Sequence, residues 1–163
     1  MTAFALLAAT PEHFARLLAG TPPEPDMVLP ASAVAPPEVL AMLAGLAAGI
    51  EAAFAPAAWL VLDGPRVTGL LSLTLPPADG VLTIGYGIAP GEEGRGAATG
   101  AVAALIDWVA RDGRAHEIAA ETNVGNIASQ RVLEHNGFCE VGRRHDDEDG
   151  DLICWRWTQP GDV

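Results

Sequence analysis

The stretch IGYGIAPGEEGRGAATG, residues 84–100, decides the fold of this chain. It starts as the end of an alternating strand, passes through a proline and a run of glycines, and continues with helical periodicity. A strand that enters a helix through such a turn directs unpaired backbone N–H groups and the positive end of the helix dipole at one point. The segment therefore predicts an anion site, with a turn that binds no ligand as the alternative.

Two widespread phosphate-binding patterns do not match this turn. The pattern Gly-x-x-x-x-Gly-Lys occurs nowhere in the sequence, which contains no lysine. The dinucleotide pattern Gly-x-Gly-x-x-Gly fails at its third glycine, because Thr99 stands there and Gly100 follows one residue late. That pattern also belongs to parallel strands, whereas hairpins are expected before residue 84. A nicotinamide dinucleotide is therefore the less favoured alternative.

The strands that precede the turn are predicted from alternation and from turn residues. Three are expected, over 59–62, 67–75 and 81–89, with turns at 63–65 and 76–80. One face of the third strand carries Leu82, Ile84, Tyr86 and Ile88. Its other face carries Gly85 and Gly87, and glycines inside a strand indicate a bulge or a ligand close to the backbone.

The segments after the turn predict a helix, a strand, a second helix and a closing hairpin. The first helix begins at Ala97 and stops at Asp112-Gly113, and the second runs over 126–136 with Asn126 as its N-cap. Strands are expected over 118–121, 138–143 and 152–158. The acidic run 146–151 does not fit a calcium-binding loop, so an exposed hairpin turn is expected there.

The N-terminal third predicts two helices separated by a long loop. Thr10-Pro11-Glu12 is typical of a helix start, and apolar residues over 39–54 recur at helical spacing. The intervening segment 21–37 holds too many prolines for a helix or a central strand, and it serves as a lid or as a surface connection. The order of elements predicts one α/β (α+β) domain over residues 1–163, built on a mixed sheet.

Composition excludes several classes of protein. The chain has 163 residues, a net charge of −12 and a 50% hydrophobic content, which fits a globular domain with a single core. An acidic chain repels phosphate backbones and anionic membranes, so neither nucleic acid nor a membrane is an expected partner. The N-terminus lacks a basic leader and the apolar run 39–50 is short, so we expect a cytoplasmic protein.

No metal site is expected from the candidate ligands. Cys139 and Cys154 do not have a metal-ligand spacing, and neither do the four histidines. By default, each of His13, His116, His135 and His145 is expected at the surface.

A second motif, NVGNIASQRVLEHNGF at residues 123–138, follows the glycine turn at a characteristic distance. Together the two motifs resemble the GNAT acyl-CoA N-acetyltransferases, and most of all the branch of the ribosomal-protein-alanine acetyltransferases. Closely matched motifs cover residues 81–143. The resemblance implies a mostly antiparallel central sheet, flanked by helices and splayed where acetyl-CoA lies between strands 81–89 and 118–121.

The resemblance also implies where acetyl-CoA binds. Its pyrophosphate is expected on the amides of the glycine turn, and its pantetheine arm beside the strand that precedes the turn. Asn126 and Ser129 are expected at the pantetheine and thiol end. The implied cofactor-binding residues are Tyr86, Gly87, Ile88, Gly94, Arg95, Gly96, Ala97, Ala98, Thr99, Asn126 and Ser129.

The catalytic residues are less directly implied. Thr83 and Leu133 stand where many relatives have a carboxylate and a tyrosine. Ser129 is the candidate proton donor to the leaving thiolate, and Glu121 the candidate base. The expected reaction moves an acetyl group from acetyl-CoA, without a metal, to a primary amine by direct attack in a ternary complex. A non-catalytic acetyl-CoA-binding sensor or structural protein is the alternative.

The acceptor is expected to be a protein N-terminus, a polyamine or another small amine. The surplus of acids favours a cationic acceptor, in a site walled by the first two helices, the proline-rich loop and the closing hairpin. The apolar content of the chain permits a homodimer.

Overall fold

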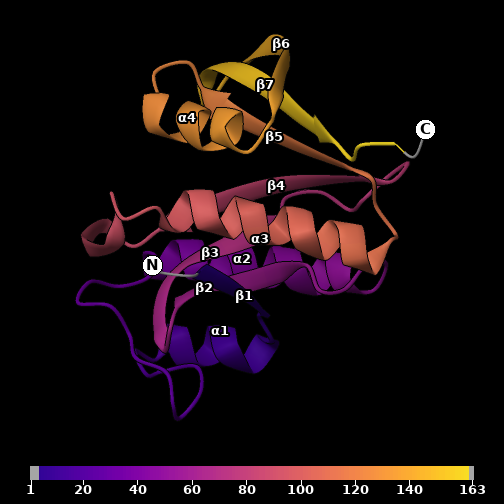
Figure 1. Cartoon of the computed structure of the whole chain (residues 1–163). Helices are drawn as coiled ribbons and strands as arrows, with labels where there is room; N and C mark the ends of the chain where they lie inside the picture. The colour runs from indigo at the N-terminus through magenta and orange to yellow at the C-terminus, as the bar shows by residue number, and fades with distance from the viewer. Residues whose placement is uncertain (1–3, 162–163) are drawn as a thin grey trace.

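A computed structural model describes residues 4–161 of the chain. Its centre is a seven-stranded sheet in the order β1-β2-β3-β4-β5-β7-β6 (Figure 1). The strands are β1 (Phe4–Ala8), β2 (Ala58–Asp63), β3 (Arg66–Leu73), β4 (Val81–Ile88), β5 (Glu117–Asn123), β6 (Cys139–Asp146) and β7 (Gly150–Thr158). The helices are α1 (Pro11–Leu18), α2 (Pro37–Glu51), α3 (Ala97–Asp112) and α4 (Ile127–His135), with a short 3-10 turn η1 (Pro90–Glu92).

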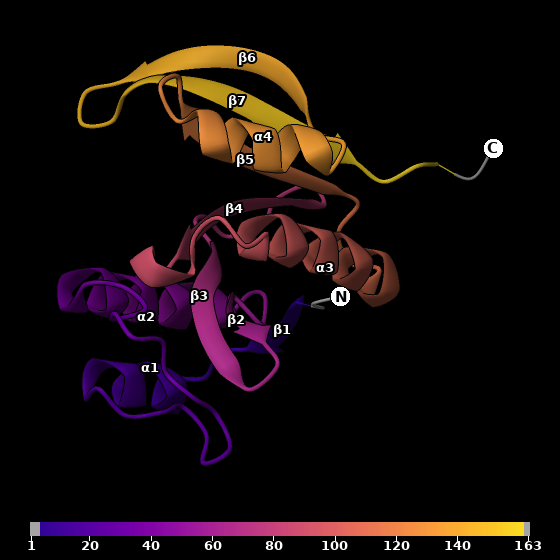
Figure 2. The same ribbon diagram turned by 60° about the vertical axis from the view of Figure 1, so that its left-hand side comes forward.

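Helices cover both faces of the sheet over strands β1 to β4. On one face, Trp59 of β2 packs edge-on against Trp108 of α3, with ring centroids 5.3 Å apart. On the other face lies α2, which is followed outward by α1 (Figure 2). Strands β5, β7 and β6 form the other side of the molecule together with α4, as both views show.

The sheet is splayed between β4 and β5. These two strands are the parallel pair of the sheet, and their register runs only from Val81–Glu117 to Ile84–Ala120. Beyond it, β4 continues to Ile88 and β5 to Asn123 without pairing to each other. The mixed, mostly antiparallel and splayed sheet expected from the sequence is confirmed.

The hydrogen bonds of β4 show which backbone groups face the splay. Thr74 N–H donates to the Thr83 carbonyl at 2.8 Å, and Ala89 N–H donates to the Thr68 carbonyl at 2.8 Å. Odd-numbered residues of β4 therefore bond to β3. Because N–H and C=O groups alternate between the two edges of a strand, those of Tyr86 and Ile88 point toward the open edge.

Most predicted elements appear within a few residues of their expected positions, but two expectations are wrong. Strand β1 was not expected, because its sequence FALLA is short and lacks alternation; its position is fixed by antiparallel pairing with β2. His13 is buried rather than exposed. Its ring accepts from Thr10 N–H at 3.1 Å and pairs with Glu24 at 2.7 Å, which closes the start of α1.

Within residues 4–161, no helix combines the length and the apolar character needed to cross a membrane.

Candidate active site

The glycine turn between β4 and α3 has the backbone geometry of an anion site. Gly94 and Gly96 have φ angles of 78° and 85°, in the left-handed region that favours glycine. Gly96 is the N-cap of α3 and has no side chain to cap the helix. The hydrogen bond from Gly100 N–H to the Gly96 carbonyl, 2.9 Å long, begins the helical ladder. The amides of Ala97, Ala98 and Thr99 precede it and are free to bind an anion.

The acidic residue at the start of this turn is neutralised inside the protein. Glu92 is buried, and its Oε1 lies 2.9 Å from Arg66 Nε and 3.7 Å from Arg95 Nη1. This arrangement ties the turn to the beginning of β3. It also removes much of the repulsion that a buried carboxylate beside the turn would exert on a phosphate.

A tyrosine and a serine meet on the α3 and α4 side of β4. The Tyr86 hydroxyl lies 2.7 Å from Ser129 Oγ, within hydrogen-bonding distance, and 3.4 Å from the Ser129 carbonyl. Burial raises the pKa of Tyr86 above its ordinary value of 10.0, and the bond to Ser129 offsets this in part. The phenol is therefore protonated at neutral pH and is able to donate to Ser129.

Two asparagines of the second motif hold α4 in place. The Asn126 side chain accepts from Ser129 N–H at 3.2 Å, so the predicted N-cap of α4 is confirmed. Asn136 Nδ2 donates to the Thr99 carbonyl at 3.2 Å and to the Val132 carbonyl at 2.9 Å. Asn136 thereby connects the end of α4 to the first turn of α3. Sequence reasoning missed this role, although Asn136 stands directly before the predicted terminal glycine.

Glu121 lies on β5 beyond the last residue paired with β4. Its carboxylate forms a two-pronged ion pair with the Arg144 guanidinium of β6, in which Arg144 Nη2 lies 2.7 Å from Oε1. Hydrogen bonding from Arg144 lowers the pKa of Glu121 below its ordinary value of 4.5, which makes the carboxylate a weaker base.

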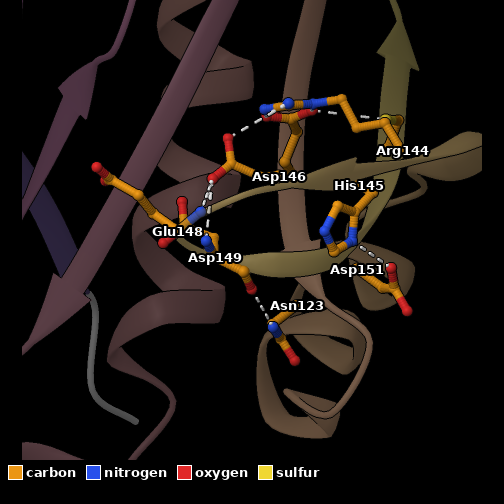
Figure 3. Close-up of polar contacts among 9 residues, drawn as sticks. Asn123, Arg144, His145, Asp146, Glu148, Asp149 and Asp151 are labelled. Carbon is orange, nitrogen blue, oxygen red and sulfur yellow. Dashed lines mark hydrogen bonds and ion pairs between the residues drawn. The ribbon is translucent and has the colours of Figure 1, made fainter.

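The acidic run forms the tip of the β6–β7 hairpin (Figure 3). The Asp146 carboxylate accepts from the N–H groups of Glu148 and Asp149 at 2.8 and 2.9 Å, and these bonds lower its pKa. Asn123 donates to the Asp149 carbonyl at 2.7 Å and so anchors the tip to β5. The expected hairpin turn is confirmed. Among residues 4–161, no group of three or more potential ligands is placed to hold a metal ion.

A cavity of about 530 Å³ opens on the opposite face of β4 from the Tyr86 hydroxyl and Ser129. It lies between the sheet, α2 and the end of the proline-rich loop. Of the four elements expected to wall the acceptor site, α2 and the proline-rich loop line this cavity, whereas α1 and the closing hairpin contribute no residue to it. Its lining residues are Ser32, Ala33, Val34, Ala35, Pro36, Val39, Leu43, Leu70, Ser72, Thr74, Gly85, Tyr86, Gly87, Ile88 and Pro90.

The predicted site residues thus gather in three places around the splay. Gly94, Arg95, Gly96, Ala97, Ala98 and Thr99 form the turn; Tyr86 and Ile88 form the open edge; Asn126 and Ser129 form the start of α4. The backbone of Gly87 faces β3 instead, and its Cα faces the cavity. Leu133 is completely buried, and Thr83 binds Thr74 through its carbonyl.

Comparison with known proteins supports this architecture. The family model described as "Acetyltransferase (GNAT) domain" matches residues 4–139. No curated protein matches the sequence. Among solved structures, RimL, a ribosomal-protein alpha-N-acetyltransferase in complex with coenzyme A, is 20% identical, with a TM-score of 0.72 over 98% of this chain and 96% of that one.

Two further structures are similar in fold. AAC(6')-Ib in complex with ribostamycin and coenzyme A is 19% identical, with a TM-score of 0.69 over 96% of this chain and 93% of that one. A spermidine N-acetyltransferase chimera of SpeG from Vibrio cholerae with hSSAT is 21% identical, with a TM-score of 0.57. That match spans 63% of this chain and 66% of the chimera. The family model covers most of the chain and confirms the resemblance of the two motifs: this chain belongs to the GNAT acetyltransferase family.

Proposed function

We propose that this chain transfers an acetyl group from acetyl-CoA to a primary amine while both are bound. The observation that carries the proposal is the open edge of β4, where the N–H and C=O groups of Tyr86 and Ile88 face the splay. An extended pantetheine arm is able to pair with such an edge as a further strand does. The glycine turn follows on the same chain, with the free amides of Ala97, Ala98 and Thr99 for the pyrophosphate.

Acetyl-CoA supplies an activated acetyl thioester. The amine nitrogen forms a bond to the acetyl carbon as the carbon–sulfur bond breaks; the nitrogen loses a proton and the sulfur gains one. In this proposal the Ile88 N–H, which faces the open edge of β4, donates to the thioester oxygen, where negative charge develops. The Tyr86 hydroxyl and Ser129 Oγ lie 2.7 Å apart; when Tyr86 is the donor of this pair, the Ser129 proton is free for the sulfur.

The reaction also needs an acceptor for the proton that the amine loses. Glu121 is the candidate from the sequence, and it lies on the same sheet face as the cavity because Thr83 and Ala119 are paired in register. Its ion pair with Arg144 stabilises the charged form, so Glu121 acts on the amine either weakly or through water.

A second candidate function is the binding of acetyl-CoA without turnover. The observation that favours it is the burial of Leu133 at a position where many relatives have a tyrosine. In this case the splay binds the cofactor, and no residue completes the proton transfers.

Titration with acetyl-CoA, followed by thiol release with a panel of primary amines, tests the proposal. We expect saturable binding of acetyl-CoA and amine-dependent release of CoA. Ser129→Ala is expected to retain binding and to lose most turnover. Tight binding with no amine-dependent release supports the second function, and the absence of acetyl-CoA binding contradicts both.

A further inference from the structure

We propose that the acceptor is a small primary amine carried on an uncharged, apolar body, rather than a polycation. The inference rests on the proposed function, because it assigns the cavity beside β4 to the acceptor. That cavity and the Tyr86–Ser129 pair lie on opposite faces of β4, so a bound amine reaches the open edge of the strand from the face opposite Ser129.

Two glycines of β4 form the floor of the cavity, where neither contributes a side chain. Gly85 and Gly87 of β4 lie opposite Ser72 and Leu70 of β3, on the face that lines the cavity. A Cβ built on Gly87 meets no atom within 4 Å, and one on Gly85 comes to 3.3 Å from a methyl carbon of Thr74. Gly87 therefore leaves space for a ligand beside the backbone, whereas the Thr74 methyl fills part of the space beside Gly85.

The walls of the cavity carry no charge. Most of its apolar side chains come from the proline-rich loop, α2 and β3, and its polar side chains carry hydroxyls. No aspartate or glutamate is among its lining residues within the described chain. A second ammonium group placed in this cavity would lose hydration without gaining a carboxylate partner, which is strongly unfavourable. The cavity therefore selects against acceptors with several cationic groups.

Two serines of the cavity lining have a hydroxyl without a hydrogen-bond partner in the described chain. Ser72 is 4% exposed, and its Oγ finds no hydrogen-bond partner within residues 4–161. Ser32 Oγ, on the loop across the cavity, is likewise buried and unpaired in the described chain. An unpaired buried hydroxyl is destabilising. Because both Oγ atoms are almost inaccessible in the structure, a neutral hydrogen-bonding group on the acceptor would reach one only after that side chain turns toward the cavity.

The acids that give the chain its net charge lie elsewhere. Glu121 is paired with Arg144, and Glu92 is paired with Arg66. The acids at the hairpin tip, Asp146 to Asp151, belong to a hairpin that contributes nothing to the cavity. The expectation of a cationic acceptor, which came from net charge alone, is therefore not supported at the cavity.

The direct test compares amines in the CoA-release assay with the intact protein. The probes are 2-phenylethylamine, its 4-hydroxy derivative, spermidine, ribostamycin and a short peptide with a free N-terminus. We expect kcat/KM for the two phenylethylamines to exceed that for spermidine and ribostamycin by about a hundredfold or more, as expected when a second charge is desolvated without a partner. A preference for spermidine, ribostamycin or the peptide overturns the inference and leaves the proposed function standing.

Failure of the proposed function has a different signature. If acetyl-CoA does not bind, or if it binds and no probe accelerates CoA release, then the proposed function fails and the inference fails with it. Binding of acetyl-CoA is therefore measured first, by titration.

Ser72→Ala separates a ligand-binding hydroxyl from a structural one. Because the hydroxyl is unpaired in the folded protein, its removal is expected to leave the melting temperature unchanged or raised. The KM for 4-hydroxyphenylethylamine is expected to rise about fivefold, the size of one neutral hydrogen bond, with kcat little changed. A fall in melting temperature with an unchanged KM contradicts the assignment of Ser72 to the acceptor.

Val39→Glu places a carboxylate at the wall of the cavity. We expect it to lower the kcat/KM ratio of 2-phenylethylamine to spermidine by about tenfold, the effect of one close charge pair. The matched control is Met42→Glu on the same helix, where Met42 is 57% exposed and does not line the cavity. An equal change of the ratio in both variants contradicts a cavity effect.

Gly87→Val fills the floor of the cavity. It is expected to raise the KM for amines, with a larger effect on the phenylethylamines than on spermidine. Gly142→Val in β6 is the matched control, because a Cβ at Gly142 also meets nothing within 4 Å. Unchanged kinetics in Gly87→Val would place the acceptor outside the cavity.

Discussion

Strands on the two sides of the splay differ in how many of their faces are covered. On one side, β2 and β3 are buried at almost every position, between α2 on one face and α3 on the other. On the other side, β5 alternates between buried and exposed residues, and β6 is mostly exposed. The uncovered face there carries ion pairs such as Glu121–Arg144 and Glu117–Arg156.

In the proposed function the two halves contribute different groups. The covered half contributes backbone amides, an apolar cavity and the Tyr86 phenol, and the half-solvated side contributes Ser129 and the charged groups. The splay is where the two halves meet. Variants that act on one half, or on the contacts between them, therefore test different parts of the proposed function.

The largest effect is expected from Gly96→Val in the covered half. A valine at φ 85° strains the turn, and loss of amide–anion hydrogen bonds worth about 1.5–3 kcal/mol each should weaken acetyl-CoA binding by roughly a hundredfold or more. Gly113→Val is the matched control, since Gly113 has a φ of 83° at the opposite end of the same helix. The Gly113→Val variant should lose a similar amount of stability and still bind acetyl-CoA. Equal losses of binding in both variants would show that the turn has no special role.

The next effect concerns the contact between the halves. Ser129→Ala is expected to lower kcat about a hundredfold, and Tyr86→Phe about tenfold, because the phenol acts through the serine. The double variant should be no slower than Ser129→Ala alone, and the Kd for acetyl-CoA should change little in all three. The kcat values are measured from the rate of CoA release. Multiplicative losses in the double variant would contradict a shared proton path.

Two ion pairs, one on each side of the splay, allow the two halves to be compared by their effect on stability. Glu92→Gln should lower the free energy of unfolding by about 2–3 kcal/mol, somewhat less than for a fully buried pair, because Arg66 is 35% exposed. Glu121→Gln should lower it far less, since Arg144 and Glu121 lie in contact with water. Urea unfolding of both variants measures the difference. A larger loss for Glu121→Gln would reverse the comparison of the two halves.

The smallest effect is expected on the pH dependence of stability, through the Glu121–Arg144 ion pair on the half-solvated side. The Arg144 guanidinium holds the pKa of Glu121 below 4.5, so the stability that this pair adds is present above pH 4.5 and is lost as the pH falls through the lowered value. In Arg144→Met this acid-dependent loss should shrink, as measured by unfolding at a series of pH values. The same variant tests Glu121 as the acceptor of the amine proton. If Glu121 has this role, loss of Arg144 raises its pKa, and the fall of kcat/KM on the acid side of the pH profile moves to higher pH. An unchanged pH profile contradicts the role.

Local sequence patterns predicted the turn, the second motif and most of the elements, for physical reasons. The backbone at positions 94 and 96 is left-handed, which favours glycine, and the free amides at the start of α4 favour a capping residue such as Asn126. These constraints act within a few residues of chain, so they leave a local mark on the sequence. The same is true of the proline-rich loop and of the hairpin tip.

What could not be predicted depends on residues far apart in the chain. Tyr86 and Ser129 are 43 residues apart, and Arg144 and Glu121 are 23 residues apart. Strand β1 is set by pairing with β2 rather than by its own pattern, and His13 is buried by its contacts with Thr10 and Glu24. The neutral lining of the cavity likewise arises from α2, β3, β4 and the loop together, whereas net charge describes the whole chain at once.

Tyr86 is the only tyrosine in the sequence, and it sits at the splay. Absorbance of the ionised phenol in an alkaline titration therefore reports one known position, without labelling or mutation. Since burial raises the pKa of Tyr86, its ionisation opposes folding, and the protein should lose stability as the pH rises from 10.0 through the folded value. A ligand that covers the phenol should delay that spectral change further, which makes the ultraviolet spectrum an intrinsic gauge of occupancy.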